Sequence, residues 1–419
     1  MKKLYVLCCI IFTSGTIFAQ TLNLKECIDK TLKNHPDIKT FMLKIEQSKK
    51  SYNSAYSDNL PQINLQGGYN ITQTYPVTAN NTFKTIDDNG WSLGVDLRQK
   101  LWDFSKTKYK VEAFKKDEDI SKLSLKEAKA LLAFKVKSLY ESMVVQKEAI
   151  EVRKKDIETK KALYEQAKAL VKQGLKTKAD ESRFFASLYN AKSSMQTAKS
   201  LYKKAKDSLS LYMGEDIDDD IILQRDSIKK ELSPSLRDMD SIIKNNYQIK
   251  IDVKNIEKNR LLHQSSKAAK YGHIDAIASY SRIGALRDDY NSKLLGATLN
   301  IPLYSGGRLD AEAQKAKIAY LIAKEKKSSE ILRLKDEIEG LLTDIERYDA
   351  TIRAKKEELF SVNETKKVVG GRYKVGLATY TEVLDAVSSF LNAKLALLEA
   401  YYLKSVAIDR LQYLKGKIK

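Results

Sequence analysis

The chain has 419 residues and carries 74 Lys and Arg against 54 Asp and Glu, a formal net charge of +20 at pH 7. The basic residues are scattered among acidic ones along helical patterns, so we interpret them as solvated helix faces and expect no nucleic-acid partner. The three histidines are dispersed, and neither a phosphate-binding glycine loop nor an H-E-x-x-H helix occurs, which favours a protein that is not an enzyme and uses no metal or cofactor.

Residues 1–19 have the pattern of a secretory signal peptide. Two lysines come first, an apolar stretch follows, and Ala19 ends a plausible cleavage site. Cys8 and Cys9 lie inside the apolar stretch, so we expect no N-terminal lipid. Removal of this segment leaves Cys27 as the one cysteine in the sequence, which excludes an internal disulfide.

Residues 20–214 predict a helix, a hairpin, a long helix and a return helix. Apolar residues at helical spacing predict the first helix over residues 22–57, and Pro36 predicts a break just before it. An apolar seam at spacings of three and four predicts a helix over residues 105–171, roughly 100 Å long. After a glycine turn, a shorter helix returns over residues 178–213.

Between these helices the apolar period changes from 3.6 to 2. The alternation predicts strands over residues 62–74 and 91–102, each with one apolar face and one polar or charged face. Strands of about ten residues with aromatic residues near their ends fit a transmembrane β-hairpin. A soluble hairpin packed on a core fits the same alternation, and the pattern alone does not decide between them.

Residues 215–235 interrupt the helical pattern and separate two halves of the chain. This segment begins with the acidic run Glu215-Asp-Ile-Asp-Asp-Asp220, which lacks the ligand order of a calcium-binding loop. We therefore interpret it as a solvated linker.

Residues 236–416 repeat the plan of the first half. The two Gly-Leu-x-Thr turns begin at Gly174 and Gly376, 202 positions apart. The repeated pattern predicts strands over 274–283 and 294–303, a long helix over 307–375 and a return helix over 379–414. We interpret the chain as two copies of one unit, with nine extra residues in the hairpin loop of the first copy.

Four spanning strands cannot close a barrel, since the smallest outer-membrane barrels use eight. An open sheet edge cannot lie in lipid, because its N–H and C=O groups find no partner there. If the strands are transmembrane, the chain must therefore oligomerise. These arguments allow two, three or more copies.

The order of these elements, given twice, resembles the TolC family of outer-membrane efflux and export ducts. The local motifs that carry the resemblance are Leu22-Asn-Leu-Lys-Glu-Cys-Ile28, Lys33-Asn-His-Pro-Asp-Ile-Lys39, Leu60-Pro-Gln-Ile-Asn-Leu65, Ile301-Pro-Leu-Tyr-Ser-Gly-Gly307 and Gly376-Leu-Ala-Thr-Tyr-Thr-Glu-Val-Leu-Asp-Ala386. No single motif is decisive, but the ordered set in duplicate is specific.

The resemblance implies a mainly α-helical fold with a transmembrane β-barrel portion. It implies a homotrimer with a 12-stranded barrel in the outer membrane, in contact with outer-membrane lipid, and an α-helical barrel in the periplasm. The linker would belong to an equatorial segment. The implied function is a passive exit duct of a tripartite efflux or type I secretion system, with a periplasmic adaptor and an inner-membrane pump as partners and an iris-like gate.

The resemblance also implies roles for residues near the two turns. The turn tips would contact the adaptor: Gly174, Leu175, Lys176 and Thr177, with Gly376, Leu377, Ala378 and Thr379. Glu382 and Asp385 match acidic positions that face the lumen and narrow its closed end, where a trimer would present six carboxylates that favour cations. Tyr373 and Asp180 match positions that hold the closed tip through hydrogen bonds.

A second reading is a soluble or surface-attached coiled-coil protein with a structural or adhesive role, whose hairpins are small capping domains. Four alternating segments of similar length with aromatic residues near their ends favour the membrane reading, because an adhesin has no need of them.

Overall fold

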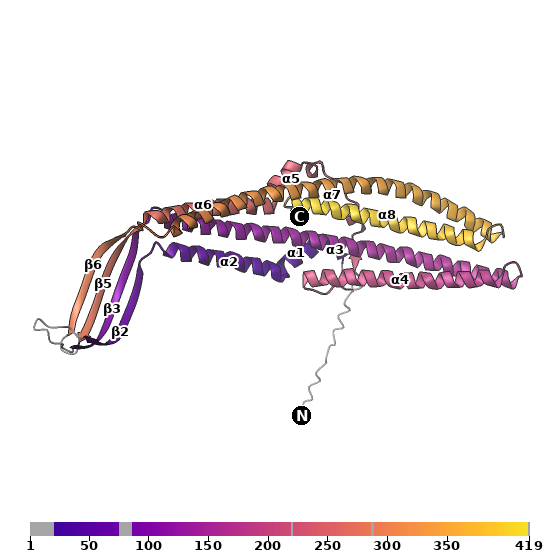
Figure 1. Cartoon of the computed structure of the whole chain (residues 1–419). Helices are drawn as coiled ribbons and strands as arrows, with labels where there is room; N and C mark the ends of the chain where they lie inside the picture. Colours follow the sequence, from indigo (N-terminus) through magenta and orange to yellow (C-terminus); the bar gives the residue numbers. More distant parts are fainter. Residues whose placement is uncertain (1–20, 75–85, 219–220, 286–288, 418–419) are drawn as a thin grey trace, which may run out of the picture.

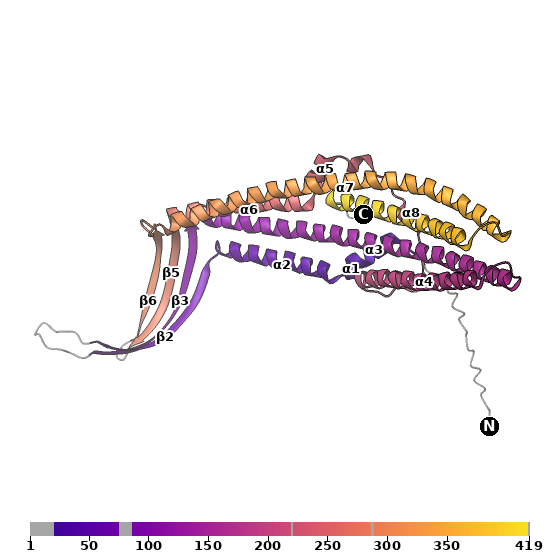
Figure 2. The same cartoon turned by 45° about the vertical axis from the view of Figure 1, so that its right-hand side comes forward.

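The computed structural model describes residues 21–74, 86–218, 221–285 and 289–417, and the predicted signal segment lies outside these ranges. The described chain forms an elongated rod of helices with a four-stranded sheet at one end (Figures 1 and 2). The turns that join the long helices to their return helices lie together at the other end of the rod (Figure 1).

The elements of the two halves follow the same order apart from a few short additional elements. The first half contains β1 (Thr21–Leu22), α1 (Leu24–Asn34), α2 (Pro36–Ser57), β2 (Gln62–Thr74), β3 (Ile86–Trp102), α3 (Lys106–Lys172) and α4 (Lys178–Met213). The linker contains β4 (Ile222–Leu223) and two short 3₁₀ turns, η1 (Arg225–Ile228) and η2 (Pro234–Leu236). The second half contains α5 (Met239–Asn245), α6 (Tyr247–Ala268), η3 (Ala269–Tyr271), β5 (His273–Ala285), β6 (Asp289–Asn300), α7 (Arg308–Lys374) and α8 (Tyr380–Leu414).

The two long helices set the length of the rod. Helices α3 and α7 each contain 67 residues, which corresponds to about 100 Å. Each packs against two shorter helices that lie one after the other along it. Helices α2 and α4 pack on α3, and α6 and α8 pack on α7. Helix α3 also contacts α6 and α8, so it joins the two halves (Figure 1).

Two asparagines hold the stacked short helices end to end. The Asn34 side-chain amide donates to the Met213 carbonyl at the end of α4, at 3.0 Å, and the Asn246 amide donates to the Leu414 carbonyl at the end of α8, at 2.9 Å. The last carbonyls of a helix have no partner within it, so an outside donor stabilises that end. Pro36 begins α2, as expected for a residue without a backbone N–H.

The linker is not simply solvated, contrary to our interpretation of its acidic run. Four of its apolar side chains are buried at mid-rod against α1, α3 and α4: Ile217, Ile221, Leu223 and Ile228. Strand β4 pairs with β1 in a two-stranded parallel sheet. Glu215, Asp216 and Asp218 are exposed, whereas Ile217 between them is buried.

The sheet is antiparallel with the order β2-β3-β5-β6, which leaves β2 and β6 at the edges. The predicted strand bounds were wrong at two places. Strand β3 begins at Ile86 rather than at residue 91, because backbone pairing with β2 continues through polar residues. Strand β6 runs from Asp289 to Asn300 rather than over residues 294–303, and Pro302, which has no backbone N–H, lies beyond its end.

Gly272 sits where the helical rod meets β5, in a backbone conformation with φ 85° and ψ −158° that is essentially restricted to glycine. A Cβ at this position would lie 2.1 Å from the Asn300 carbonyl oxygen. We expect Gly272→Ala to lower the free energy of unfolding by about 2 kcal/mol or more, since strain of about 1–3 kcal/mol adds to a backbone clash. Thermal unfolding of the purified protein measures this loss.

Gly296→Ala is the matched control, because a Cβ on Gly296 in β6 meets no atom within 4 Å. Equal melting temperatures for the two variants would contradict the assigned role of Gly272.

Candidate functional site

The four-stranded sheet presents an exposed apolar face in the single chain. The strand register places odd-numbered residues of β2, β3 and β6 on this face, together with even-numbered residues of β5. Its exposed apolar and aromatic members include Ile63, Leu65, Tyr69, Ile71, Trp91, Leu93, Val95, Tyr280, Leu295 and Leu299. Ile71 and Leu295 are 75% and 86% exposed, so nothing in the described chain covers this face. A contiguous apolar surface of this kind marks a contact with lipid or another protein.

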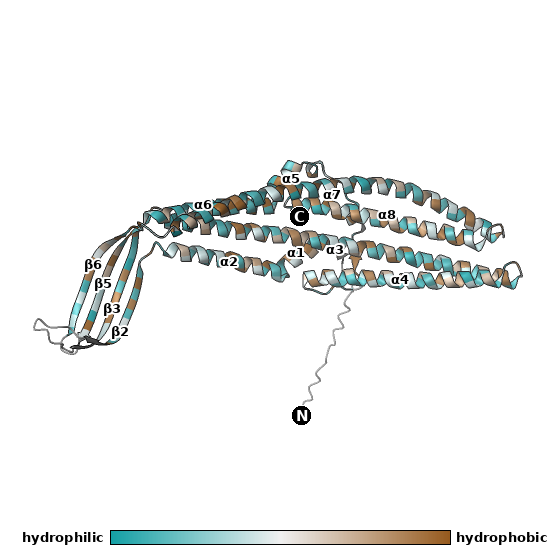
Figure 3. Cartoon of the chain, viewed as in Figure 1, coloured by the Kyte–Doolittle hydropathy of each residue, from teal (hydrophilic) through white to brown (hydrophobic). Residues whose placement is uncertain are grey.

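The helices, unlike this face of the sheet, are mostly hydrophilic on their surfaces. Figure 3 shows hydrophilic residues along the whole length of α3, α4, α7 and α8. Among the described residues, no helix contains an apolar stretch of the length and hydropathy required to cross a bilayer.

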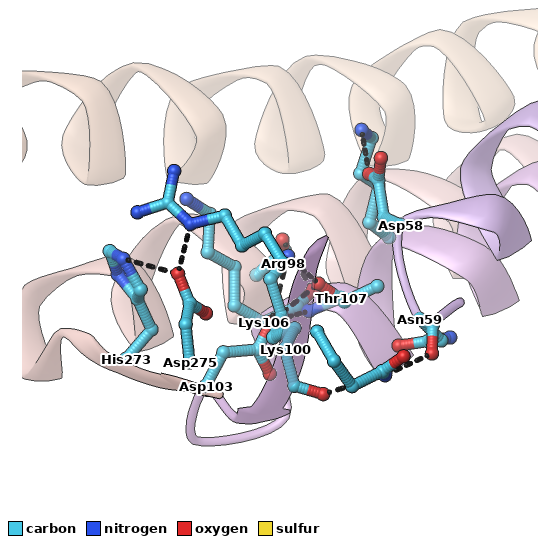
Figure 4. A network of polar contacts seen from close by, with 12 residues as sticks. Asp58, Asn59, Arg98, Lys100, Asp103, Lys106, Thr107, His273 and Asp275 are labelled. Carbon is cyan, nitrogen blue, oxygen red and sulfur yellow. Dashed lines mark hydrogen bonds and ion pairs between the residues drawn. The ribbon is translucent and has the colours of Figure 1, made fainter. Parts of the chain in front are cut away.

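A network of polar contacts joins the sheet to the helices (Figure 4). The Arg98 guanidinium on β3 lies 2.8 Å from the nearly buried Asp275 carboxylate on β5, and the His273 ring lies 3.6 Å from the same carboxylate. This contact connects the first hairpin to the second. The Gln99 amide donates to the Asn59 carbonyl at 2.8 Å and so ties β3 to the chain leaving α2.

The start of α3 is held by the same network. The Lys100 ammonium donates to the Thr107 hydroxyl at 3.0 Å, and the Thr107 backbone N–H donates to the Asp103 carboxylate at 2.9 Å (Figure 4). Phe104 and Ser105 adopt positive φ values of 56° and 67°, which are costly for residues with a Cβ. The corresponding turn before α7 uses Gly306 and Gly307 instead, at 61° and 79°.

Both turns at the far end of the rod are built in the same way. Gly174 and Gly376 have φ values of 74° and 82°, the left-handed conformation that glycine adopts without strain. The Leu175 N–H donates to the Leu170 carbonyl and the Leu377 N–H to the Arg372 carbonyl, at 2.9 and 2.8 Å. These bonds satisfy carbonyls at the ends of α3 and α7.

A capping box begins each return helix. The Thr177 and Asp180 side chains accept from each other's backbone N–H groups, at 3.3 and 3.1 Å. The Thr379 and Glu382 side chains do the same, at 3.2 and 2.6 Å. These bonds lower the pKa of the Glu382 carboxyl, which keeps it ionised.

The two tips are in contact through a cluster that we call the tip cluster: Lys176, Phe184, Tyr373 and Tyr380. The Phe184 ring centroid lies 5.6 Å from that of Tyr373 and 6.4 Å from that of Tyr380. Phe184 and Tyr373 are fully buried. The Lys176 ammonium lies 5.3 Å from the Tyr373 ring and donates to the Ala378 carbonyl at 3.4 Å. Aromatic and cation–π contacts thus hold the two turns together.

The predicted gate residues do not form one group in this chain. Asp180 and Glu382 serve as capping residues. The Tyr373 hydroxyl has no hydrogen-bond partner among the described residues, so it makes none with Asp180. Asp385 is exposed on α8, and no ion pair or hydrogen bond with another described residue engages it. Leu175 and Leu377 are 66% and 68% exposed at the two tips.

The sequence reading missed Phe184, Tyr380 and Arg183, whose guanidinium lies 4.5 Å from the Tyr380 ring centroid. An aromatic pair, Phe184-Phe185, one turn into the return helix was the available signal. Its partner Tyr373 lies far away in sequence, and helical periodicity carries no information on such a pairing.

Comparison with known proteins places these features in a family. The model of the outer membrane efflux protein family matches twice, over residues 27–215 and 239–417. The chain is 21% identical over 422 residues to the outer membrane protein TolC of Escherichia coli, an alignment that covers 96% of this chain and 84% of that protein.

Solved structures agree on the fold. The chain matches CusC, described in a study of folding and transmembrane channel formation, with a TM-score of 0.83 and 18% identity, covering 94% of this chain and 92% of that one. It matches VceC of Vibrio cholerae with a TM-score of 0.81 and 16% identity, covering 94% and 97%. The chain therefore belongs to the outer membrane efflux protein family, whose members are outer-membrane channels and not enzymes.

Proposed function

We propose that three copies of this chain form an exit duct that spans the outer membrane and extends into the periplasm. The observation that carries the proposal is a sheet with an uncovered apolar face and two open edges, at one end of a helical rod about 100 Å long. The duct conducts passively and opens through a gate at its periplasmic end.

Closure of the sheet supports oligomerisation. Strands β2 and β6 have an unpaired edge in the single chain, and such an edge is not tolerated in lipid. Three copies would pair β6 of one chain with β2 of the next and give a closed barrel of 12 strands, an even number within the bacterial range. Two copies would also close a sheet, and the family resemblance favours three.

The helical part supports a tunnel built from two similar units. We infer that residues 20–214 and 236–416 are repeats of one ancestral unit, joined by the linker 215–235 at the equator. Both family-model matches fall within or close to these bounds. Each unit contributes one long helix with two stacked short helices on it, so three chains would supply six such layers around a lumen.

The tips are the proposed gate and docking region. Exposed Leu175 and Leu377 lie on the turns, and apolar residues on a tip favour contact with a periplasmic adaptor, which in turn recruits an inner-membrane pump. Asp385, with Glu382 behind it, would form a ring of carboxylates in the trimer that favours cations. The tip cluster would hold each pair of tips in the closed position.

The alternative function is a coiled-coil structural or adhesive protein. Such a protein has no use for a sheet face on which Ile71 and Leu295 are uncovered, and this face would cause aggregation in water.

The assembly is tested by fractionation. We expect the protein to stay in the outer-membrane fraction until detergent is added, and to run on a gel as a trimer that heat dissociates. These properties follow from a lipid-covered barrel shared by three chains. A soluble monomer released without detergent would contradict the duct and support the coiled-coil alternative.

The closing role of the tip cluster is tested in reconstituted bilayers. We expect Phe184→Ala and Tyr373→Ala to increase the open fraction of the channel about fivefold or more, since one aromatic pair contributes about 1 kcal/mol. Tyr373→Phe keeps the ring and should conduct like the unmodified protein, because the hydroxyl has no described partner. Opening by Tyr373→Phe would instead assign the closed state to a hydrogen bond.

The carboxylate ring is tested by cation block. We expect Asp385→Ala to weaken block by a polyamine about tenfold, or about 1.4 kcal/mol, since three carboxylates leave the lumen. Glu399→Gln is the control for helix α8, because Glu399 is also exposed on α8 but lies 14 residues farther from the tip than Asp385, or about 20 Å. Unchanged block in Asp385→Ala would remove Asp385 from the gate.

A further inference from the structure

Two fully buried carboxylates lie close together at mid-rod, on helices from different halves. Glu141 belongs to α3 and Asp409 to α8, and neither side chain is exposed. Lys230, from the linker, forms an ion pair with each of them; its ammonium lies 2.5 Å from one Asp409 oxygen. One lysine therefore joins the linker, the first half and the second half. We call Lys137, Glu141, Lys230 and Asp409 the mid-rod charge cluster.

The cluster lacks the donors to satisfy two carboxylates. One oxygen of Glu141 and one of Asp409 have no hydrogen-bond partner among the described residues. The Lys137 ammonium lies 3.7 Å from the second Asp409 oxygen but donates to the Gln412 amide at 3.1 Å. A buried carboxylate oxygen without a donor is costly when the group is ionised and less so when a proton occupies it.

The other charged groups around the cluster are already engaged. Lys404 on α8 is nearly buried and lies 2.7 Å from Asp349 on α7 and 3.2 Å from Glu231 of the linker. The buried Ser405 hydroxyl on α8 lies near Glu141, but it carries no charge and makes no hydrogen bond with a described residue. The two carboxylates of the cluster therefore have Lys230 as their close cationic partner, and Lys137 lies farther away, at 3.7 Å from Asp409.

Burial, followed by the charge of Asp409, raises the pKa of Glu141 to about 7, against the attraction of Lys230. Burial also lowers the pKa of Lys137. A carboxyl whose pKa is raised in the folded state binds its proton more tightly there than in the unfolded chain. Its contribution to stability is therefore largest in acid and declines as the pH rises from about 4.5 through about 7.

We propose that Glu141, Asp409 and Lys230 form a proton-binding site that fastens the linker to both halves of the chain. With the proton on Glu141, the Glu141 side chain carries no charge and the Asp409 carboxylate remains as the partner of Lys230. When this proton leaves to solvent, past the partly exposed Lys230, the buried charge on Glu141 lacks hydration, and this desolvation outweighs the attraction of Lys230. Detachment of the linker would hydrate the Glu141 carboxylate, so detachment becomes less costly. Lys230 and the linker around it are then held less firmly between α3 and α8.

The site gives the middle of the rod a response to pH in the neutral range. Below pH 7 the linker is fastened to α3 and α8, and above it the contact between the halves loosens. Because α3 and α8 continue from this point toward the tips, the site couples periplasmic acidity to the relative freedom of the two halves (Figure 2).

Hydrogen–deuterium exchange of the purified, detergent-solubilised full-length protein tests the proposal. The variant Glu141→Gln mimics the protonated state. At pH 8 we expect residues 224–232 to exchange up to about tenfold more slowly in Glu141→Gln than in the unmodified protein, because a pKa of about 7 leaves Glu141 about nine-tenths ionised there. At pH 5.5 the two proteins should match. Comparison within each pH removes the intrinsic pH dependence of exchange.

Asp349→Asn is the matched control, since it removes a carboxylate that contacts Lys404 rather than Lys230. Its effect on exchange should be the same at both pH values. Infrared difference spectra provide an independent readout: the C=O band of a protonated carboxyl should disappear between pH 5.5 and pH 8, and be missing from Glu141→Gln. A difference in exchange that does not change with pH, or an unaltered infrared band, would overturn the proposal. Neither readout depends on conduction, so both are separate from the tests of the duct.

Discussion

A backbone N–H or C=O group placed in hydrocarbon must find its hydrogen-bond partner within the protein. This constraint governs the sheet of the present chain, whose edge strands β2 and β6 lack such partners on their outer sides. The apolar face adds a second demand, because it lies uncovered by any described part of the chain. The sheet is thus incomplete in the single chain, and the proposed pairing of β6 with β2 of the next copy would complete it.

Helix α3 connects everything else, since it contacts the short helices of both halves. The stacked short helices meet through single amide donors, Asn34 and Asn246, that stabilise the terminal carbonyls of α4 and α8. Helix α3 also contributes Lys137 and Glu141 to the mid-rod charge cluster. The hydrogen bonds that complete the helix ends and the buried ion pairs therefore lie in the same part of the rod, where the two halves are joined.

The sequence predicted the long helices closely, because an unbroken apolar seam ends at a glycine with positive φ at each tip. It did not predict the strand ends, since ladder pairing extends through polar residues and stops at a proline. It also misread the linker as solvated, because isoleucines placed irregularly among aspartates gave no clear helical or strand period. The capping roles of Asp180 and Glu382 follow the local pattern of Thr and acid three residues apart. The ring pair of Phe184 and Tyr373 and the contact of Lys230 with Asp409 join distant segments, and no local pattern specifies them.

The equal length of α3 and α7, 67 residues each, means that both tips of one chain end at the same level. The length of these helices therefore sets the distance between the sheet and any partner that contacts the tips. One inserted residue would advance a tip by about 1.5 Å and rotate it by about 100°. An insertion or deletion that keeps each tip in its orientation must therefore be close to seven residues, or two helical turns. It must occur in both long helices and both return helices together. Each such change alters the length of the rod by about 10 Å.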